Sequence, residues 1–379
     1  MLNFLKLIVI FVIASGAILY FTKKDNRLKT PHLPIIVEGI PADLKKAENA
    51  NILIIGSGIS EYITPMLEEI GGEYKSIFKG GLKVFNWSEK EEGIHRTLHK
   101  WRSLNKKPLI TIFLGGEAEF FEKKFLVKDT KKIKQNIERI KDPKLATLFS
   151  LLPQAAPYVL HSVNKFIYDV NMPSKKDFPL SEMESVEALK YIEFNLKLFK
   201  YFLNQLILEV RSAGKNIIFI SYPSNPKSEV HQVCNASKTS TITETLYEID
   251  ELVKDKEDQK ALEIARVLSQ KALGNSDVFL TRAKLEEKAK NHQSALRLYE
   301  LAHMFDCGTK EANIVTNKII QTVSDEFGVE FVDFYKMITQ DFGKGPLFID
   351  GKIPQEKYFS ALKKVLKKNI SEIIDGLEN

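Results

Sequence analysis

The sequence predicts an α/β fold built on a doubly wound parallel sheet, and two observations support it. Short apolar runs recur along the chain, and glycine directly follows several of them. Longer segments with apolar residues at helical spacing separate these runs. Strands that alternate with helices form parallel sheets, because each helix carries the chain back to the edge where the next strand starts.

Composition is that of a globular protein. The chain has 379 residues, of which 44% are hydrophobic and 27% charged, so it is long enough for one large core or two domains and is not a disordered chain. The formal net charge of +6 is small for this length, and the lysines are spread along amphipathic helices rather than grouped with aromatic residues. We therefore expect no nucleic-acid partner.

Residues 1–22 are uncharged apart from Lys6 and are mostly apolar. As a helix this stretch spans roughly 30 Å, enough to cross a bilayer. A cleaved signal peptide is the alternative, with Ser15 and Ala17 as a weak cleavage site, but the apolar run continues past them. We predict an uncleaved transmembrane anchor over residues 1–22.

The side of the membrane that holds the body is open at this level. Lys6 lies before the apolar run, and four lysines and arginines lie at residues 23–29 after it, which taken alone favours a cytoplasmic body. The two cysteines, Cys234 and Cys307, each lie beside a turn-forming residue. A pair suits one disulfide in an oxidising compartment, and two buried free thiols fit as well.

A spacer and three strands are expected in the first third of the chain. Residues 23–49 are polar and contain three prolines, which is typical of a spacer. Residues 51–55 are a continuous apolar run, the pattern of a strand buried in a parallel sheet. A helix over residues 61–70 follows, and further strands are expected at residues 83–86 and 109–114.

The same alternation continues later in the chain. Residues 184–212 carry leucine and phenylalanine at helical spacing and predict a long helix that ends at Ala213-Gly214. Strands are expected at residues 216–221 and 329–333, and an amphipathic helix at residues 355–374.

Two helical segments interrupt this alternation. Residues 125–178 are mostly helical, apolar and punctuated by proline, and we expect them to pack beside the sheet. Residues 238–308 form a second helical insert, so that the sheet domain spans residues 50–237 and resumes over residues 309–379.

The insert carries a repeat signal. Alanine and tyrosine at the seam spacing of a tetratricopeptide helix pair are found at Ala283, Ala295, Tyr299 and Ala302. Matching positions one repeat earlier hold Ala261, Ala265 and Leu268. Small residues at such positions let two helices approach closely, and one and a half repeats are too few to be stable without the main domain. An ordinary helical hairpin with alanine in its seam is the alternative.

Three short blocks carry a likeness to a known family. Residues 52–60 read Ile-Leu-Ile-Ile-Gly-Ser-Gly-Ile-Ser, residues 116–120 read Gly-Glu-Ala-Glu-Phe, and residues 348–354 read Phe-Ile-Asp-Gly-Lys-Ile-Pro. Their order and spacing resemble the SGNH (GDSL-type) hydrolase superfamily, over residues 51–120 and 192–367. Bacterial envelope members with a tetratricopeptide-like insert are the most similar, and the resemblance implies a flavodoxin-like sheet.

The resemblance also implies that the residues of acyl transfer are missing. In the family the first strand ends in Gly-Asp-Ser, whereas here Ser57 takes the aspartate position and Gly58 the position of the nucleophile. The second block normally reads Asn-x-Gly, and this chain has Asn86 followed by Trp87 and Ser88.

The later blocks are altered in the same way. Ala118, next to Glu119, stands where the family has its oxyanion-binding asparagine. Asp350 matches the last block, but Ile353 replaces the histidine. Acyl transfer needs an attacking oxygen, a base and donors for the oxyanion, so the likeness implies a protein that is not an enzyme.

Some of these residues have alternative interpretations. Ser57 or Ser60 is either a displaced nucleophile or a helix cap, and capping is the commoner role of serine at such a place. His231 is either a base or a solvated loop residue. His95 and His99 have the i, i+4 spacing of a metal site, but no neighbouring acids or cysteines complete a ligand set, so a solvent-exposed helix face is expected.

Glu117 and Glu119 lie where ligands bind in α/β folds, at the end of the third strand. Two carboxylates there could act in acid–base chemistry or bind a cationic partner. We expect instead that they are solvated or lie at a helix N-terminus. We expect neither a metal nor a cofactor.

Three hypotheses of function follow. The first is a single-pass protein of the bacterial inner membrane whose periplasmic body binds or scaffolds an integral membrane protein or envelope complex. The second is an active esterase or O-acyltransferase on envelope glycans that uses Ser57 or Ser60. The third is a glycan or peptidoglycan binder without turnover.

Overall fold

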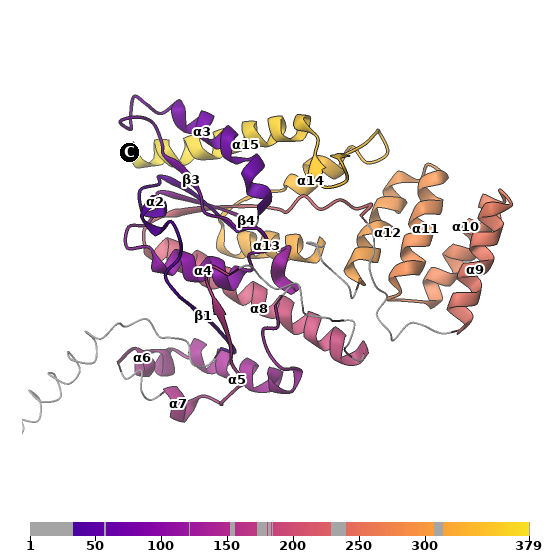
Figure 1. Ribbon diagram of the computed structural model, residues 1–379, viewed down its shortest axis with the longest axis horizontal. Coiled ribbons are helices and arrows are strands. Elements are labelled where there is room, and N and C mark those ends of the chain that lie inside the picture. Colours follow the sequence, from indigo (N-terminus) through magenta and orange to yellow (C-terminus); the bar gives the residue numbers. More distant parts are fainter. Residues whose placement is uncertain are drawn as a thin grey trace, which may run out of the picture. The chain divides into compact units, whose positions relative to one another are not determined.

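The computed structural model describes residues 33–56, 58–120, 122–151, 156–172, 180, 183, 185–228, 240–306 and 314–378 (Figure 1). The chain divides into two compact units. The small unit comprises Met1–Glu38 and Lys123–Asp169, and the large unit comprises Gly39–Glu122 and Val170–Asn379.

The large unit contains a five-stranded parallel sheet in the order β3-β2-β4-β6-β7. Its strands are β2 (Ile52–Gly56), β3 (Val84–Asn86), β4 (Ile110–Leu114), β6 (Asn216–Ile220) and β7 (Glu330–Val332). Numbered along the chain, the five strands lie in the order 2-1-3-4-5. The predicted parallel α/β sheet is confirmed, with every strand within a residue or two of its expected place.

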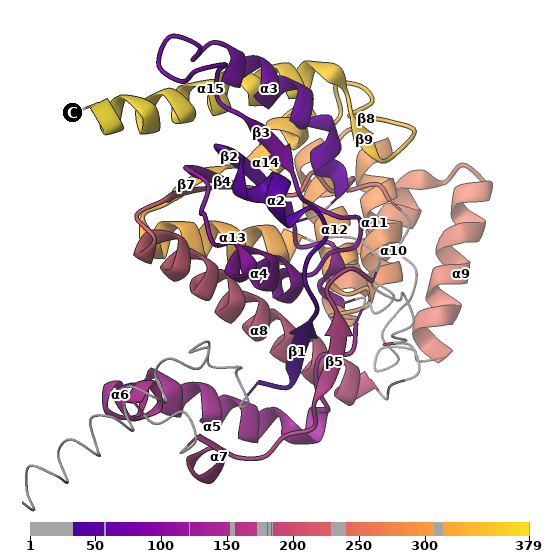
Figure 2. The same cartoon turned by 60° about the vertical axis from the view of Figure 1, so that its left-hand side comes forward.

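Helices cover both faces of this sheet (Figures 1 and 2). On one face lie α3 (Thr64–Gly72), α14 (Phe334–Thr339) and α15 (Glu356–Glu378). On the other lie α4 (Ile94–Ser103), α8 (Ser185–Ser212) and α13 (Ile314–Phe327). These layers fit a doubly wound sheet.

Alternation along each strand divides its side chains between the two layers. Ile52 and Ile54 join the core beneath α3 and α15, so Leu53 and Ile55 point to the opposite face, and all four are 0% exposed. Burial on both faces explains why the strands read as continuous apolar runs.

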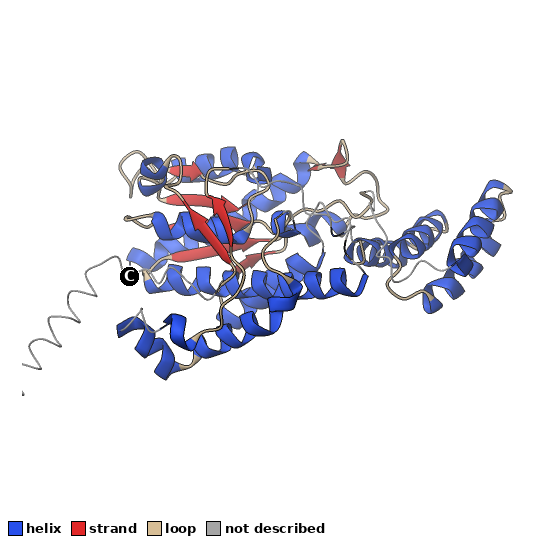
Figure 3. Ribbon diagram, turned by 60° about the horizontal axis from the view of Figure 1, so that its bottom comes forward, coloured by secondary structure: helices blue, strands red, loops and turns tan. Residues whose placement is uncertain are grey.

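Within its described residues, the helical insert contains four successive helices, which extend away from the sheet in Figure 3. They are α9 (Ser240–Lys254), α10 (Asp258–Lys271), α11 (Ser276–Lys288) and α12 (His292–Met304). All seven predicted seam residues are buried. Residues of α11 and α12 join the core of the sheet domain, whereas α9, α10 and part of α11 share an apolar cluster of their own. The insert therefore packs on the main domain, as expected.

The large unit also contains short elements. They are α2 (Leu44–Glu48), the 3₁₀ helices η1 (Gly58–Tyr62) and η2 (Ala118–Phe120), and the hairpin of β8 (Phe348–Ile349) and β9 (Ile353–Pro354).

The small unit has its own sheet and core. Its β1 (Ile35–Glu38) pairs in parallel with β5 (Phe166–Asp169). Its other elements directly precede β5 in sequence: η3 (Val127–Asp129), α5 (Thr130–Lys141), α6 (Pro143–Leu151) and α7 (Ala156–Val159). Phe149, Ala156 and Leu160 form its apolar cluster. The Asn136 amide donates to the carbonyl of His161 at 2.9 Å and accepts its N–H at 2.8 Å.

Two expectations need correction here. The spacer predicted over residues 23–49 is partly folded, because it contributes β1 and α2. Residues 125–178 do not simply belong to the sheet domain, since most of them form the small unit with β1. The pairing of β1 with β5 joins residues about 130 positions apart, which no local pattern reveals.

Other predictions fall outside the described residues. The apolar run 1–22, Ser57, His231, Cys234 and Cys307 all do. Within the described ranges, no helix combines the length and apolar character that a membrane crossing requires.

Candidate functional site

The carboxyl ends of β2 and β3 bring together three residues singled out in the sequence, Ser60, Asn86 and Ser88. The Oγ atoms of Ser60 and Ser88 lie 3.2 and 2.6 Å from the side-chain oxygen of Asn86, and the two hydroxyls also contact each other. The Asn86 amide nitrogen donates to Thr64 Oγ1 at 3.0 Å, and the Thr64 hydroxyl donates to the Ser60 carbonyl at 3.0 Å. We call Ser60, Thr64, Asn86 and Ser88 the hydroxyl cluster.

Asn86 organises this cluster through one acceptor. An amide oxygen accepts hydrogen bonds but is not a base, so it does not remove a proton from serine. Among the described residues, no histidine or carboxylate is hydrogen-bonded to Ser60 or Ser88.

Glycines shape the turn that precedes the cluster. Gly56 has φ +110°, and a Cβ there would lie 2.3 Å from the Leu114 carbonyl oxygen. At Gly58, the position of the family nucleophile, a Cβ would lie 3.0 Å from the Lys90 Cα. The backbone of Lys90 therefore closely covers the position where the resemblance would place a reactive side chain.

Ala118 and Glu119 are buried at the end of β4. Glu119 Oε1 accepts the backbone N–H of Ile94, the first residue of α4, at 2.8 Å. The Asn195 amide donates to the Glu119 carbonyl at 2.6 Å. The carboxylate therefore satisfies an N-terminal donor of α4, which has no side-chain cap of its own. Of the two expected interpretations for this residue, solvation is wrong because Glu119 is 0% exposed, and the hydrogen bond supports its place at a helix N-terminus.

Asp350 and Ile353 lie in the β8–β9 hairpin. Asp350 is exposed, has φ 48°, and its Oδ1 accepts the N–H groups of Lys352 and Ile353 at 3.3 and 3.4 Å. Its carboxylate therefore stabilises its own turn. The Asn225 amide donates to the Gly351 carbonyl at 2.8 Å, which connects the hairpin to the segment Pro223-Ser224-Asn225 that follows β6.

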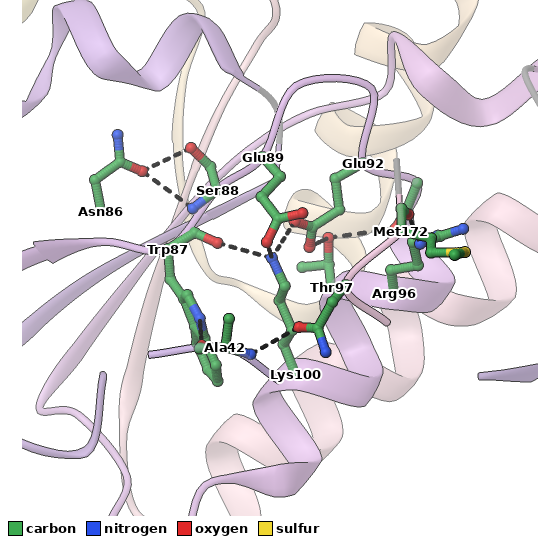
Figure 4. Close-up of polar contacts among 12 residues, drawn as sticks. Ala42, Asn86, Trp87, Ser88, Glu89, Glu92, Arg96, Thr97, Lys100 and Met172 are labelled. Carbon is green, nitrogen blue, oxygen red and sulfur yellow. Dashed lines mark hydrogen bonds and ion pairs between the residues drawn. The ribbon is translucent and has the colours of Figure 1, made fainter. Parts of the chain in front are cut away.

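A buried lysine lies beside the hydroxyl cluster (Figure 4). Lys100 of α4 is 0% exposed, and its ammonium donates to Glu92 at 2.6 Å, Glu89 at 2.8 Å and the Trp87 carbonyl at 3.1 Å. These three acceptors use all three donors of an ammonium group. The Thr97 hydroxyl donates to the second oxygen of Glu92 at 2.8 Å.

Burial sets the protonation of Glu92. Desolvation disfavours the carboxylate, and although Lys100 and Thr97 favour it, the pKa of Glu92 rises to about 7. A carboxyl group with this pKa exchanges a proton near neutral pH. Glu92 is not one of the residues that the resemblance to SGNH hydrolases singles out.

A second buried charge cluster lies on the same helix. Glu122 accepts from His95 Nε2 at 2.8 Å and from Arg96 Nη2 at 2.5 Å, and Arg96 also donates to the Met172 carbonyl. Burial opposes the charge of Glu122, but the hydrogen bonds and charges of His95 and Arg96 outweigh it and lower its pKa to about 2.

The prediction of a solvent-exposed face for His95 and His99 is wrong for His95. His95 is 4% exposed, and His99 is partly buried with its Nε2 3.1 Å from the Gly39 carbonyl oxygen. No group of three histidine, cysteine or acidic side chains suited to a metal ion occurs within the described part of the chain.

Lys100, Glu92 and Glu122 are the residues that sequence reasoning missed. One signal was present in the sequence. Glu92 and Lys100 are eight residues apart, and the residues from Glu92 to Trp101 form a short helical pattern with Trp101 on its apolar side. That pattern predicts a charged surface helix, whereas in the fold these side chains are buried.

The insert carries a further polar feature. An open pocket of about 570 Å³ lies between α10, α11 and α12, and its lining includes Arg266, Arg282, Glu286, Lys290 and His292. Glu286 is 1% exposed and lies 2.9 Å from Arg266 and 3.5 Å from Arg282. The paired arginines therefore serve first to neutralise a buried acid.

Comparisons of the chain with protein-family models, with curated proteins and with solved structures found no match.

Proposed function

We propose that the protein is a non-catalytic binding component of a bacterial envelope assembly, built on a fold of the SGNH-hydrolase type. In this proposal residues 1–22 anchor it in the inner membrane, the body lies in the periplasm, and the partner is an integral membrane protein or envelope complex. The observation that carries the proposal is the bonding of the hydroxyl cluster.

Serine becomes a nucleophile when a base takes its proton. Ser60 and Ser88 lie instead against the Asn86 amide oxygen and against each other. At the neighbouring block, the Glu119 carboxylate is engaged with the backbone of α4. These contacts favour a structural role for the polar residues over acyl transfer.

The sheet supports the choice of fold. Its strand order is that of flavodoxin-like doubly wound sheets, whose ligands bind where the order reverses, between β2 and β4 here. Gly56, Gly58 and Ala118 lie at that place and carry no functional group.

The insert supports a binding role. Paired helices of the tetratricopeptide type present surfaces that hold a protein segment. Tyr247, Val267 and Leu273 on and after α9 and α10 are 68%, 51% and 76% exposed, respectively, and could contact a partner. We assign the partner contact to these two helices.

Labelling with a fluorophosphonate probe tests the catalytic part. The full chain in detergent-solubilised membranes is expected to form no adduct, beside a serine esterase as positive control. An adduct that disappears in Ser60→Ala or Ser57→Ala would overturn the proposal in favour of the esterase or O-acyltransferase.

Cross-linking in native membranes followed by affinity purification and mass spectrometry tests the binding part. The double variant Val267→Glu/Leu273→Glu is expected to lose an envelope membrane protein that the unchanged chain retains. Ile349→Glu, at a 56% exposed apolar residue of the β8–β9 hairpin, is the matched control and should retain it. Retention of peptidoglycan fragments without a protein partner would instead favour the glycan-binding alternative.

A further inference from the structure

The positive charge of the chain is concentrated in the small unit. Residues 123–169 contain ten lysines and arginines and four acidic residues, a net charge of +6 that equals the net charge of the whole chain. The large unit contains 40 basic and 43 acidic residues, a net charge of −3. The small unit is therefore basic, whereas the large unit is slightly acidic.

Helix α5 presents part of this charge on one face. Lys131, Lys134 and Lys141 are exposed, and at 100° per residue they lie within an arc of about 80°. Ile133 and Asn136 are buried on the other side of the helix. Further exposed lysines of the unit are Lys128, Lys132 and Lys144.

One acid reduces the charge of this face without cancelling it. Glu138 lies between the three lysines around the helix and is 3.9 Å from Lys134. Both side chains are more than 60% exposed, so this ion pair is weak.

The chain ties this unit to the apolar run at its start. Eleven residues separate Phe21 from Leu33, a stretch that spans at most about 40 Å when fully extended. Because β1 begins at Ile35 and belongs to the small unit, an anchor at residues 1–22 keeps the unit close to the bilayer surface. Once the anchor holds the chain in the membrane, binding of the small unit to lipid headgroups is an intramolecular step, so even weak contacts are effective.

We propose that the lysine face of α5 docks on the anionic headgroups of the membrane that holds the N-terminal anchor. Clusters of lysine beside a membrane segment bind acidic lipid through charge alone. Helix α5 has no aromatic residue on which nucleic-acid bases would stack, which favours lipid over nucleic acid as its ligand. Tyr158 of the same unit is 92% exposed, and tyrosine favours the membrane interface. This inference rests on the proposed function for the anchor.

Quenching of an added indole tests the docking. The Gln135→Trp variant of the full chain places an indole one turn after Lys131 and is reconstituted in nanodiscs with brominated lipid. The two native tryptophans are 4% and 1% exposed and give the background. With phosphatidylglycerol present the added indole should be quenched, and in discs of phosphatidylcholine alone quenching should fall at least tenfold.

Charge reversal supplies the matched variants. Lys131→Glu/Lys134→Glu/Lys141→Glu should remove the quenching, and Lys271→Glu/Lys336→Glu/Lys364→Glu, at three exposed lysines of the large unit, should preserve it. Quenching that is the same with and without phosphatidylglycerol, or that is unchanged by the α5 substitutions, overturns the inference. Displacement of the indole from the lipid by added duplex DNA also overturns it. Release of the chain from the discs by alkaline carbonate would instead count against the anchor itself.

Discussion

Lys100 is a lysine without solvent exposure, and its three hydrogen bonds explain how the fold accommodates it. Removing one partner of a buried ion pair leaves the other charge without compensation. The two tryptophans of the chain, Trp87 and Trp101, flank this group, so their fluorescence reports on it.

We expect Lys100→Met to lower the free energy of unfolding by about 3–5 kcal/mol. At pH 8, adding Glu92→Gln should recover part of the loss, because Glu92 without the ammonium that lowers its pKa must otherwise bind a proton to stay buried without a charge. Lys46→Met, which removes an exposed pair with Asp43, is the control and should cost less than about 1 kcal/mol. Urea unfolding followed by tryptophan fluorescence measures all three, and equal midpoints for the two single variants would contradict the assignment.

Glu92 and Glu122 make stability depend on pH in opposite directions. The folded state holds the Glu92 proton up to a pKa of about 7, against 4.5 in the unfolded chain, so stability falls as pH rises between these values. The pKa of Glu122 is lowered to about 2, so its contribution is present above pH 4.5 and is lost as pH falls toward 2.

Glu92→Gln should therefore flatten the pH dependence between 4.5 and 7, and Glu122→Gln should flatten it below 4.5. Urea midpoints across this range measure both effects. Glu68→Gln, at an exposed acid of α3, serves as the control. A Glu92→Gln profile parallel to that of the unchanged chain would show that this carboxyl group does not titrate in the expected window.

At the scale of elements, the end of β2 depends on Gly56. An added Cβ would meet the Leu114 carbonyl oxygen at 2.3 Å, and φ is +110°. Gly56→Ala should therefore cost more than about 2 kcal/mol of stability. Gly72→Ala, in α3 with nothing within 4 Å of the new methyl group, should be neutral or stabilising by about 0.5–1 kcal/mol. Thermal denaturation of the two variants compares them directly.

Helix α4 begins on a carboxylate from another part of the chain. Glu119→Ala leaves the Ile94 N–H without this acceptor and should destabilise the protein by about 1–2 kcal/mol. Glu119→Gln keeps an oxygen acceptor and should cost less. Equal losses for the two variants, measured by urea unfolding, would mean that the negative charge rather than the hydrogen bond matters at this helix end.

At the scale of the whole molecule, the two units have separate apolar clusters, and tryptophan fluorescence reports on only one of them. Both tryptophans lie in the large unit, whereas circular dichroism sees the helices of both. Asn136→Ala removes the amide contacts to the His161 backbone in the small unit. It should shift part of the dichroism transition and leave the fluorescence transition unchanged, and an equal shift of both signals would contradict separate unfolding.

Much of the fold was predictable because its signals are local. Apolar runs such as Ile52–Gly56 locate the strands of a doubly buried sheet, and alanines such as Ala283 and Ala295 identify a close helix seam. The lack of a reactive side chain at Gly58 is likewise a property of the sequence.

The environment of the charged residues depends instead on segments that are distant in sequence. A helix that carries His95, Arg96 and Lys100 has the pattern of a surface helix, but all three side chains are buried, and Glu122 and the Met172 carbonyl accept hydrogen bonds from His95 and Arg96. Likewise, β1 forms only because β5 supplies its hydrogen bonds. Even for Lys100, whose acceptors Trp87, Glu89 and Glu92 are near in sequence, the pattern does not reveal burial. Burial and the pairing of distant strands are decided by residues brought together in space.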